Sequence, residues 1–393
     1  MNNHRVYLDN AATTRMDPEA VAAMTPYFTQ AYGNPSSVHG YGREARRAVE
    51  ESRAKLARAL NASPDEIYFT GGGTESDNWA IKGAAARMSK KGKRVVTSAV
   101  EHHAVLHTCE ELARGGFEIT YLPVTDQGIV QPAALASAMK PDAAIVSVMT
   151  ANNEIGTIQP IAELAAVAHE YGALFHTDAV QAVGSIPVDV KALGVDMLSL
   201  SAHKFHGPKG IGALYVKKGV RIDTFIHGGA QERGRRAGTE NVPYIVGMGA
   251  AIELAVERMD ETGGRVRRMR DRLINGLMER IPEIRVNGDM ERRLPGNANV
   301  SIRYVEGESL LLALDLKGVA ASSGSACTSG SLDPSHVLLA IGLPHEIAHG
   351  SLRLTLSGGN TDADVDYVLE ELPKIVTRLR DMSPLFADAA AAR

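Results

Sequence analysis

Lys204 stands where a short apolar run ends and a polar loop begins. Residues 197–200 are typical of a buried strand, and Ser201 and His203 flank the lysine before a Gly-Pro turn. A lysine placed between a hydroxyl and an imidazole at a strand end can form a Schiff base with an aldehyde cofactor. Taken alone, Lys204 is more typical of a solvated loop lysine, so the other polar segments must decide.

Two of those segments supply what a pyridoxal phosphate site needs. Asp178 ends another apolar strand, 26 residues before Lys204, and open α/β sheets bind ligands at that edge. The glycine-rich segment 71–78 joins a strand to a helix, where backbone N–H groups can hold a phosphate. Separately, Asp178 could be a helix cap and the glycines a plain turn. Together, a phosphate loop, a carboxylate for the pyridine nitrogen and a lysine predict this cofactor.

Four more segments carry polar groups to the same expected edge. His102 could stack on the cofactor ring or exchange protons, or be structural. The turn 152–156 could bind the cofactor or a substrate carboxylate, or be a plain turn. The basic stretch 232–239 could reach a phosphate site across an interface, or lie in solvent. Arg353, inside an apolar strand, could face solvent or bind a carboxylate bidentately.

The two cysteines have different surroundings. Cys327 lies among Ser, Gly and Ala in the stretch 321–331, which offers a core thiol no apolar sequence neighbours. An exposed thiol is an oxidation liability unless it is used, which favours a reactive role. Cys109 lies inside an amphipathic stretch and is expected to pack in the core. Two cysteines give neither a disulfide framework nor a Cys-based zinc site.

Composition excludes several classes of protein. The chain has 393 residues, a net charge of −4 and 44% hydrophobic residues, without a long basic run, so it predicts neither nucleic-acid nor membrane binding. No stretch approaches the ~18 apolar residues of a membrane span, and the N-terminus lacks the apolar core of a signal peptide. We therefore expect a cytoplasmic protein.

Strand-like and helix-like segments alternate along the first two thirds of the chain. This pattern predicts an α/β fold with a mostly parallel sheet covered by helices on both faces. The expected strands are 66–70, 94–98, 118–122, 143–149, 173–177, 197–200 and 212–216. One helix is expected over 18–31 and another over 362–380, with a kink at Pro373. The prediction divides the chain into a large domain, 15–258, and a smaller α+β domain formed by 1–14 and 259–393.

Motifs along the whole chain resemble the cysteine desulfurases of the NifS/IscS type, in the class V branch of fold-type I pyridoxal phosphate enzymes. They are YLDNAATT (7–14), GNPSSVHG (33–40), GTESDN (73–78), Glu101-His102, NNEIG (152–156), HTDAVQ (176–181), SAHK (201–204), GPKGIG (207–212), 232–239 and SSGSACTS (322–329). The run 231–241 and the ending near 379–385 look closer to the nitrogen-fixation version. Two departures are Ala230 where a third glycine is usual, and 357–360, which lacks a basic residue often found there.

The resemblance implies a role for each matching residue. It implies that Lys204 attaches the cofactor, that Cys327 is the nucleophile and that His102 stacks on the ring and serves as acid/base for the thiols. The implied cofactor contacts are Gly73, Thr74, His102, Asn153, Asp178, Gln181, Ser201, His203, Lys204 and, from the partner subunit of a homodimer, Thr239. The implied substrate contacts are Asn34, Asn153 and Arg353.

The implied reaction converts L-cysteine to L-alanine and stores the sulfur as a persulfide on Cys327. The sulfur acceptor would be an iron–sulfur scaffold protein of the NifU/IscU type, with nitrogenase clusters as the destination and Cys327 as a transient iron–sulfur ligand. Three alternatives stay open from the sequence: a selenocysteine lyase, an aminotransferase, and a sulfur-carrier platform that has no cofactor chemistry.

Overall fold

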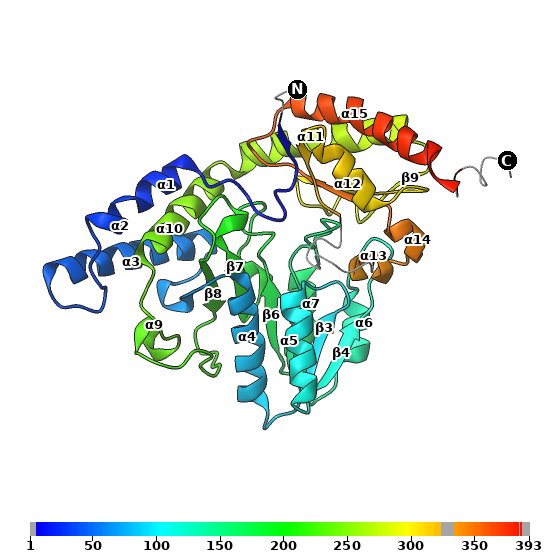
Figure 1. Cartoon of the computed structure of the whole chain (residues 1–393). Helices are drawn as coiled ribbons and strands as arrows, with labels where there is room; N and C mark the ends of the chain where they lie inside the picture. Colours follow the sequence, from blue (N-terminus) through cyan, green and yellow to red (C-terminus); the bar gives the residue numbers. More distant parts are fainter. Residues whose placement is uncertain (1–4, 324–333, 385, 387–393) are drawn as a thin grey trace.

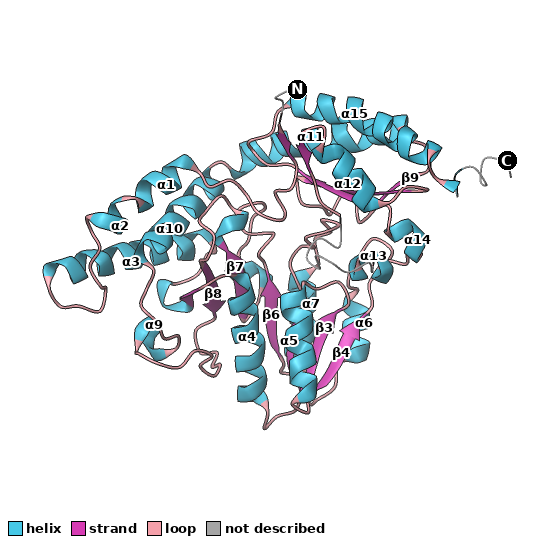
Figure 2. Ribbon diagram, viewed as in Figure 1, coloured by secondary structure: helices cyan, strands magenta, loops and turns pink. Residues whose placement is uncertain are grey.

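The computed structural model describes residues 5–323, 334–384 and 386. Its centre is a seven-stranded sheet with helices on both faces, and a smaller α+β layer sits across one end (Figures 1 and 2). The sheet order is β2-β8-β7-β6-β5-β3-β4. Its strands are β2 (Ile67–Thr70), β3 (Arg94–Ser98), β4 (Glu118–Leu122), β5 (Ala143–Ser147), β6 (Leu174–Asp178), β7 (Met197–Ser201) and β8 (Gly212–Val216).

The sheet is parallel except around β8, which runs antiparallel to both β2 and β7. Parallel strands end at the same edge, so their carboxyl-terminal side chains meet there. In the β6–β7 register, Asp178 lies opposite Ser199, and Lys204 follows five residues further along. The predicted fold class, a mostly parallel seven-stranded sheet, is thereby confirmed.

Alternating side chains of each central strand enter two different cores. On one face, Leu198 packs with α3 (Gly40–Ala59), α7 (Ile161–Glu170) and α10 (Val242–Glu257). On the other face, its neighbour Met197 packs with Trp79 of α4 (Gly73–Met88) and Val105 of α5 (His103–Arg114). Because successive strand residues point to opposite faces, an apolar run such as 197–200 is what a doubly covered strand requires.

A separate core holds the smaller layer together. It joins the sheet β12-β10-β9 to α11 (Met259–Arg280), α12 (Gly307–Asp315) and α15 (Asp362–Asp381). The strands are β9 (Ile284–Val286), β10 (Asn297–Ile302) and β12 (Ser351–Thr355). Val6 and Leu8 belong to this core because β1 (Val6–Tyr7) pairs with β11 (Val319–Ala320).

Some element boundaries differ from the sequence prediction. The helix expected over 18–31 is two helices, α1 (Pro18–Met24) and α2 (Pro26–Thr29), because Pro26 has no N–H to continue the first. Pro373 lies inside the continuous α15. The remaining short helices are α6 (Pro132–Ala138), α8 (Val190–Leu193), α9 (Gln231–Gly234), α13 (His336–Ala340) and α14 (His345–Ala348). Within the part of the chain that the structure describes, every helix is too short or too polar to cross a membrane.

Candidate active site

Lys204 ends a short 3-10 turn after β7 and points at the N-terminal arm. Its Nζ donates to the carbonyl oxygens of Ala11 and Ala12, at 2.5 and 2.8 Å. The arm is fixed over the turn by Thr14, whose N–H and Oγ1 both donate to the His203 carbonyl, at 3.0 and 2.9 Å. The YLDNAATT motif therefore forms one wall around the lysine.

Asp178 is the carboxylate that faces this lysine. It is buried, and burial raises its pKa to about 6, while the N–H of Val180 (2.9 Å) and the charge of Lys204 oppose that rise. At neutral pH the side chain is mostly ionised. A buried anion at this position can hold a proton on a heterocyclic nitrogen.

A hollow of about 720 Å³ opens at the N-terminus of α4. The N-cap residue is Gly72 and no side chain caps the helix, so its first N–H groups stay available to a ligand. Ser201 and His203 line the same hollow, and burial together with Lys204 and Lys209 lowers the pKa of His203 to about 4. A Cβ at Gly73 would come within 2.7 Å of a Val180 methyl group, so only glycine leaves this approach free.

His102 is the N-cap of α5 and stands at the end of β3. Its Nδ1 accepts the N–H of Ala104 at 3.1 Å, which leaves the proton of the neutral ring on Nε2. Burial, followed by the charge of Lys204, lowers the pKa of His102 to about 4. The imidazole is therefore uncharged at neutral pH and presents an N–H donor.

Arg353 is buried in β12 and does not face solvent. Its guanidinium donates to the carbonyl of Asn153 at 3.1 Å and to the Asp9 carboxylate at 3.0 Å. Its Nε is buried and has no hydrogen-bond partner among the described residues. The sequence prediction missed Asp9, which lies 344 residues away along the chain.

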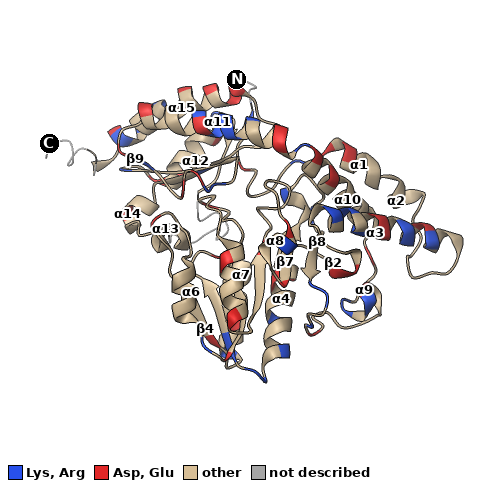
Figure 3. Cartoon of the chain, turned by 180° about the vertical axis from the view of Figure 1, so that it is seen from behind, with Lys and Arg blue, Asp and Glu red and all other residues tan. Residues whose placement is uncertain are grey.

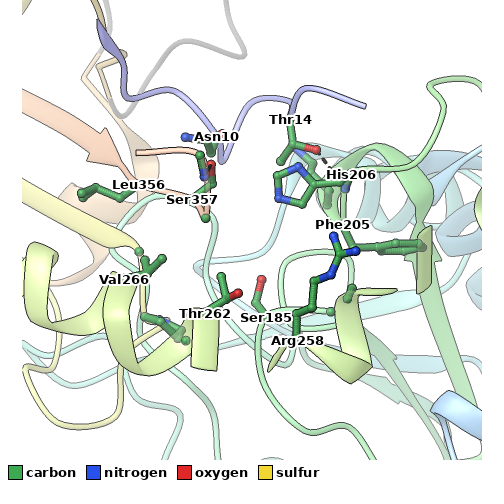
Figure 4. Close-up of a pocket in the computed structure, with 18 of the residues that line it drawn as sticks. Asn10, Thr14, Ser185, Phe205, His206, Arg258, Thr262, Val266, Leu356 and Ser357 are labelled. Carbon is green, nitrogen blue, oxygen red and sulfur yellow. Dashed lines mark hydrogen bonds between the residues drawn. The ribbon is translucent and has the colours of Figure 1, made fainter. Parts of the chain in front are cut away.

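A cavity of about 490 Å³ extends from Lys204 and Gln181 toward the junction of α10 and α11. Figure 4 shows Ser185 and Arg258 on one side of it and Ser357 on another. Gln181 donates to the Ala11 carbonyl at 2.9 Å, so it also braces the arm. Both cores contribute to the lining, and this leaves room beside the lysine for a small substrate.

Three predicted residues are not part of this assembly. Asn34 is exposed in the loop between α2 and α3, at the outer end of the helix layer and away from β6 and β7 (Figure 1). Thr239 is exposed beyond α9. Cys327 lies outside the described residues. Five residues before it in the sequence, Ser322 forms a β-bridge with Arg353 of β12.

Comparison with known proteins identifies the family. The family model described as aminotransferase class-V matches residues 6–368. The chain belongs to the class V aminotransferase family. A cysteine desulfurase IscS of Methanosarcina thermophila is 58% identical over 98% of this chain and 95% of its own length. A cysteine desulfurase of Gluconacetobacter diazotrophicus is 55% identical over 99% and 97%.

Solved structures agree with this grouping. A NIFS-like protein superposes with a TM-score of 0.90 at 41% identity, over 95% of this chain and all of its own. A structure titled SspA in complex with cysteine gives 0.81 at 35%, over 91% of this chain and all of its own. The chain is thus an enzyme of the cysteine desulfurase group, while the relatives do not single out a nitrogen-fixation version.

Enzymes of this family depend on pyridoxal phosphate, and the residues present fit it. The uncapped α4 terminus and the glycine cradle suit a phosphate, Asp178 suits the ring nitrogen, and Lys204 suits the aldehyde. Ser201 and His203 line the hollow at the N-terminus of α4, and they lie three residues and one residue before Lys204 in the sequence. The hollow and the lysine are therefore neighbours.

Proposed function

We propose that this chain converts L-cysteine to L-alanine and captures the released sulfur as a persulfide on Cys327. The observation that carries the proposal is the convergence of Lys204, Asp178 and His102 at the carboxyl ends of β7, β6 and β3. The charge of Lys204 lowers the pKa of both other groups, as expected of three side chains that share one site. The cofactor supplies an electron sink for a carbanion at the substrate Cα.

The chain's own groups account for binding and proton movement. Arg353 offers the substrate carboxylate its Nε, which has no hydrogen-bond partner among the described residues, and Asn153 lies beside it. The related structure in complex with cysteine supports an amino acid of this size. Lys204 Nζ, once uncharged, would take the Cα proton, and Asp178 would hold a proton on the nitrogen of the bound cofactor. His102 serves the thiols from its Nε2 edge, where the proton of the neutral ring lies.

The atoms balance without an external oxidant. The Cβ–S bond of the substrate breaks, an S–S bond to Cys327 forms, and protons convert the remaining carbon skeleton to alanine. The attacking group is the Cys327 thiolate, since a thiol is a poor nucleophile. An acceptor thiolate then attacks the outer sulfur, so that the S–S bond breaks, the sulfur passes to the acceptor and the Cys327 thiolate is released.

The partners follow from the same proposal. We expect a homodimer in which Thr239 reaches the other subunit's phosphate site, and a NifU/IscU-type scaffold as acceptor, with Cys327 a transient iron–sulfur ligand. The exposure of Thr239 supports the first point. A cytoplasmic location and a nitrogenase destination remain predictions from the sequence.

The test compares the two cysteines. Cys327→Ala should keep the cofactor absorbance but lose persulfide and sulfide formation from L-cysteine. Cys109→Ala is the matched control: Cys109 is buried and its pKa is raised to about 12, so the control should retain both. Undiminished sulfide release by Cys327→Ala would rule out this nucleophile. Alanine that appears only with an added keto acid would indicate an aminotransferase.

A further inference from the structure

Asp77 is a buried carboxyl of α4 that the proposed reaction leaves unused. Only 1% of its surface is exposed, and its Oδ1 has no hydrogen-bond partner among the described residues. Nε2 of His176 lies 3.6 Å from Oδ1, which is too far for a hydrogen bond. A buried carboxylate with an unmatched oxygen is far more costly than a neutral carboxyl with the same unmatched oxygen.

A chain of hydroxyl and imidazole groups leads away from Asp77. Ser199 carries the hydroxyl group that acts on the Asp77 carboxyl, and Ser199 Oγ lies 2.9 Å from His176 Nε2. Nδ1 of His176 lies 2.9 Å from Ser147 Oγ. Since Ser199 is the register partner of Asp178, the chain lies beside the carboxylate proposed to hold the cofactor nitrogen.

The charges around Asp77 favour its neutral form. The titratable groups that face it are Asp178 and His176 on β6 and Glu101 before α5, with Lys204 acting on Asp178. Burial and then Asp178 raise the pKa of Asp77 well above its ordinary value. Burial lowers the pKa of His176 to about 3, so His176 supplies no positive charge. Three carboxylates cannot all ionise in this dry interior beside one lysine.

The hydrogen-bond chain has two possible polarities, and the proton on Asp77 selects between them. With Asp77 neutral, its O–H donates to Ser199, Ser199 donates to His176 Nε2, and His176 Nδ1–H donates to Ser147. With Asp77 ionised, every donor reverses and His176 carries its proton on Nε2. The two states therefore differ in a measurable tautomer.

We propose that Asp77 is a positioning residue that stays protonated in the working enzyme and, by doing so, leaves Asp178 as the ionised carboxylate opposite the cofactor nitrogen. The proposal rests on the proposed function for the placing of the cofactor over Asp178. It concerns a group that contacts neither substrate nor cofactor and acts through Ser199 and Asp178.

Infrared spectroscopy of the holoenzyme with ¹³C-labelled aspartate carboxyls tests it directly. At pH 8, where Asp178 with its pKa of about 6 is ionised, we expect a labelled band from a protonated aspartic acid. Asp77→Asn should remove that band, and Ser199→Ala should shift its frequency because the hydrogen bond is lost. Absence of the band, or its survival in Asp77→Asn, would overturn the proposal. The same band is expected without cofactor, so failure to bind pyridoxal phosphate would count against the proposed function alone.

Two further measurements test the state of Asp77 independently. Nitrogen-15 NMR of the wild-type protein should show the Nδ1–H tautomer for His176; the Nε2–H tautomer contradicts a neutral Asp77. Asp77→Ala should weaken cofactor affinity by about tenfold, and Asp77→Asn, a neutral side chain of the same shape, should recover most of that loss. If Asn binds the cofactor no better than Ala does, the charge on Asp77 matters and the proposal fails.

Discussion

Among single residues, Arg353 has the surroundings most directly matched to an amino acid. Arg353→Lys keeps a positive charge but loses the planar guanidinium. In the wild type this group contacts Asp9, and its Nε has no hydrogen-bond partner among the described residues. We expect KM for L-cysteine to rise by about ten- to hundredfold, with the absorbance of the bound cofactor retained. Steady-state alanine formation measures this. Arg303→Lys, at an exposed ion pair with Glu283, should leave KM unchanged; a normal KM in Arg353→Lys would remove the guanidinium from the site.

Glu101 links the site to the pH dependence of stability. It is fully buried, and burial raises its pKa from 4.5 to about 8, although Ser98 and the Met149 N–H oppose the rise. Between those pH values the folded protein binds a proton that the unfolded chain does not, so stability falls as pH rises from about 4.5 to about 8.

Glu101→Gln removes this proton and keeps the hydrogen-bond acceptor. The variant should lose less stability than the wild type between pH 5 and pH 8.5, by on the order of 4 kcal/mol. Chemical unfolding at both pH values measures the difference. Glu261→Gln, at an exposed position of α11, should match the wild type; an equal fall in Glu101→Gln would show that Glu101 is ionised throughout.

The candidate site residues with distinctive chemistry were predictable from the sequence. The acidic residues that surround them were not. Lys204 and Asp178 stand out because a strand pattern ends at each of them. Asp9, Asp77 and Glu101 have no such signal: an acidic residue in a polar stretch is normally exposed. Their surroundings depend on contacts between segments far apart in the chain, such as Asp9 with Arg353, and one sequence gives no spacing that reveals these contacts.

At the level of elements, the buried strands were the most predictable. Residues 94–98 and 212–216 are buried strands with the predicted ends, because apolar runs bounded by turns are unambiguous there, and the more exposed strand 118–122 also has its predicted ends. The two-residue strand β11 was not predictable, since its pairing with β1 alone defines it. Pro373 lies inside one continuous helix, α15, whose apolar residues pack in the smaller core.

The α9 segment provides a prediction about how an element is anchored. Glu232 accepts from Arg53 of α3 at 2.8 and 2.9 Å, with both side chains 3% exposed, and the two segments lie close together in Figure 3. Glu232→Gln leaves the guanidinium charge buried without its partner, so stability should fall by about 3 kcal/mol in chemical unfolding. Glu253→Gln, at the more exposed pair with Arg58, should cost less than about 1 kcal/mol. Equal losses in the two variants would contradict a buried anchor.

For the whole molecule, we propose the division into 15–258 and 1–14 with 259–393. The two sheets have separate hydrophobic cores, and Val6 and Leu8 of the arm belong to the smaller one, which supports the division. The sequence could predict the fold class because strand and helix periods alternate along the chain. It could not predict which surfaces meet a second copy, since an exposed residue such as Thr239 has the same pattern on a free surface and at an interface.

Complementation between two defective chains tests whether Thr239 serves the other subunit. Lys204→Ala removes the proposed cofactor lysine of its own site, and Thr239→Glu places a negative charge where the phosphate would bind. In a mixed dimer of these variants, a Thr239 that acts across the interface leaves one site with an intact lysine and an intact threonine. Random mixing yields about half mixed dimers, so the activity should recover to about a quarter of wild type.

Each variant alone should be nearly inactive, and activity should appear only after the two are denatured and refolded together. If Thr239 instead acted within its own chain, both sites of the mixed dimer would be defective and no activity would return. Native mass spectrometry of the same samples, with one variant isotopically labelled, establishes that mixed dimers are present. Recovery near a quarter would therefore assign the exposed end of the 232–239 segment to the partner's phosphate site, where no single-chain geometry can place it.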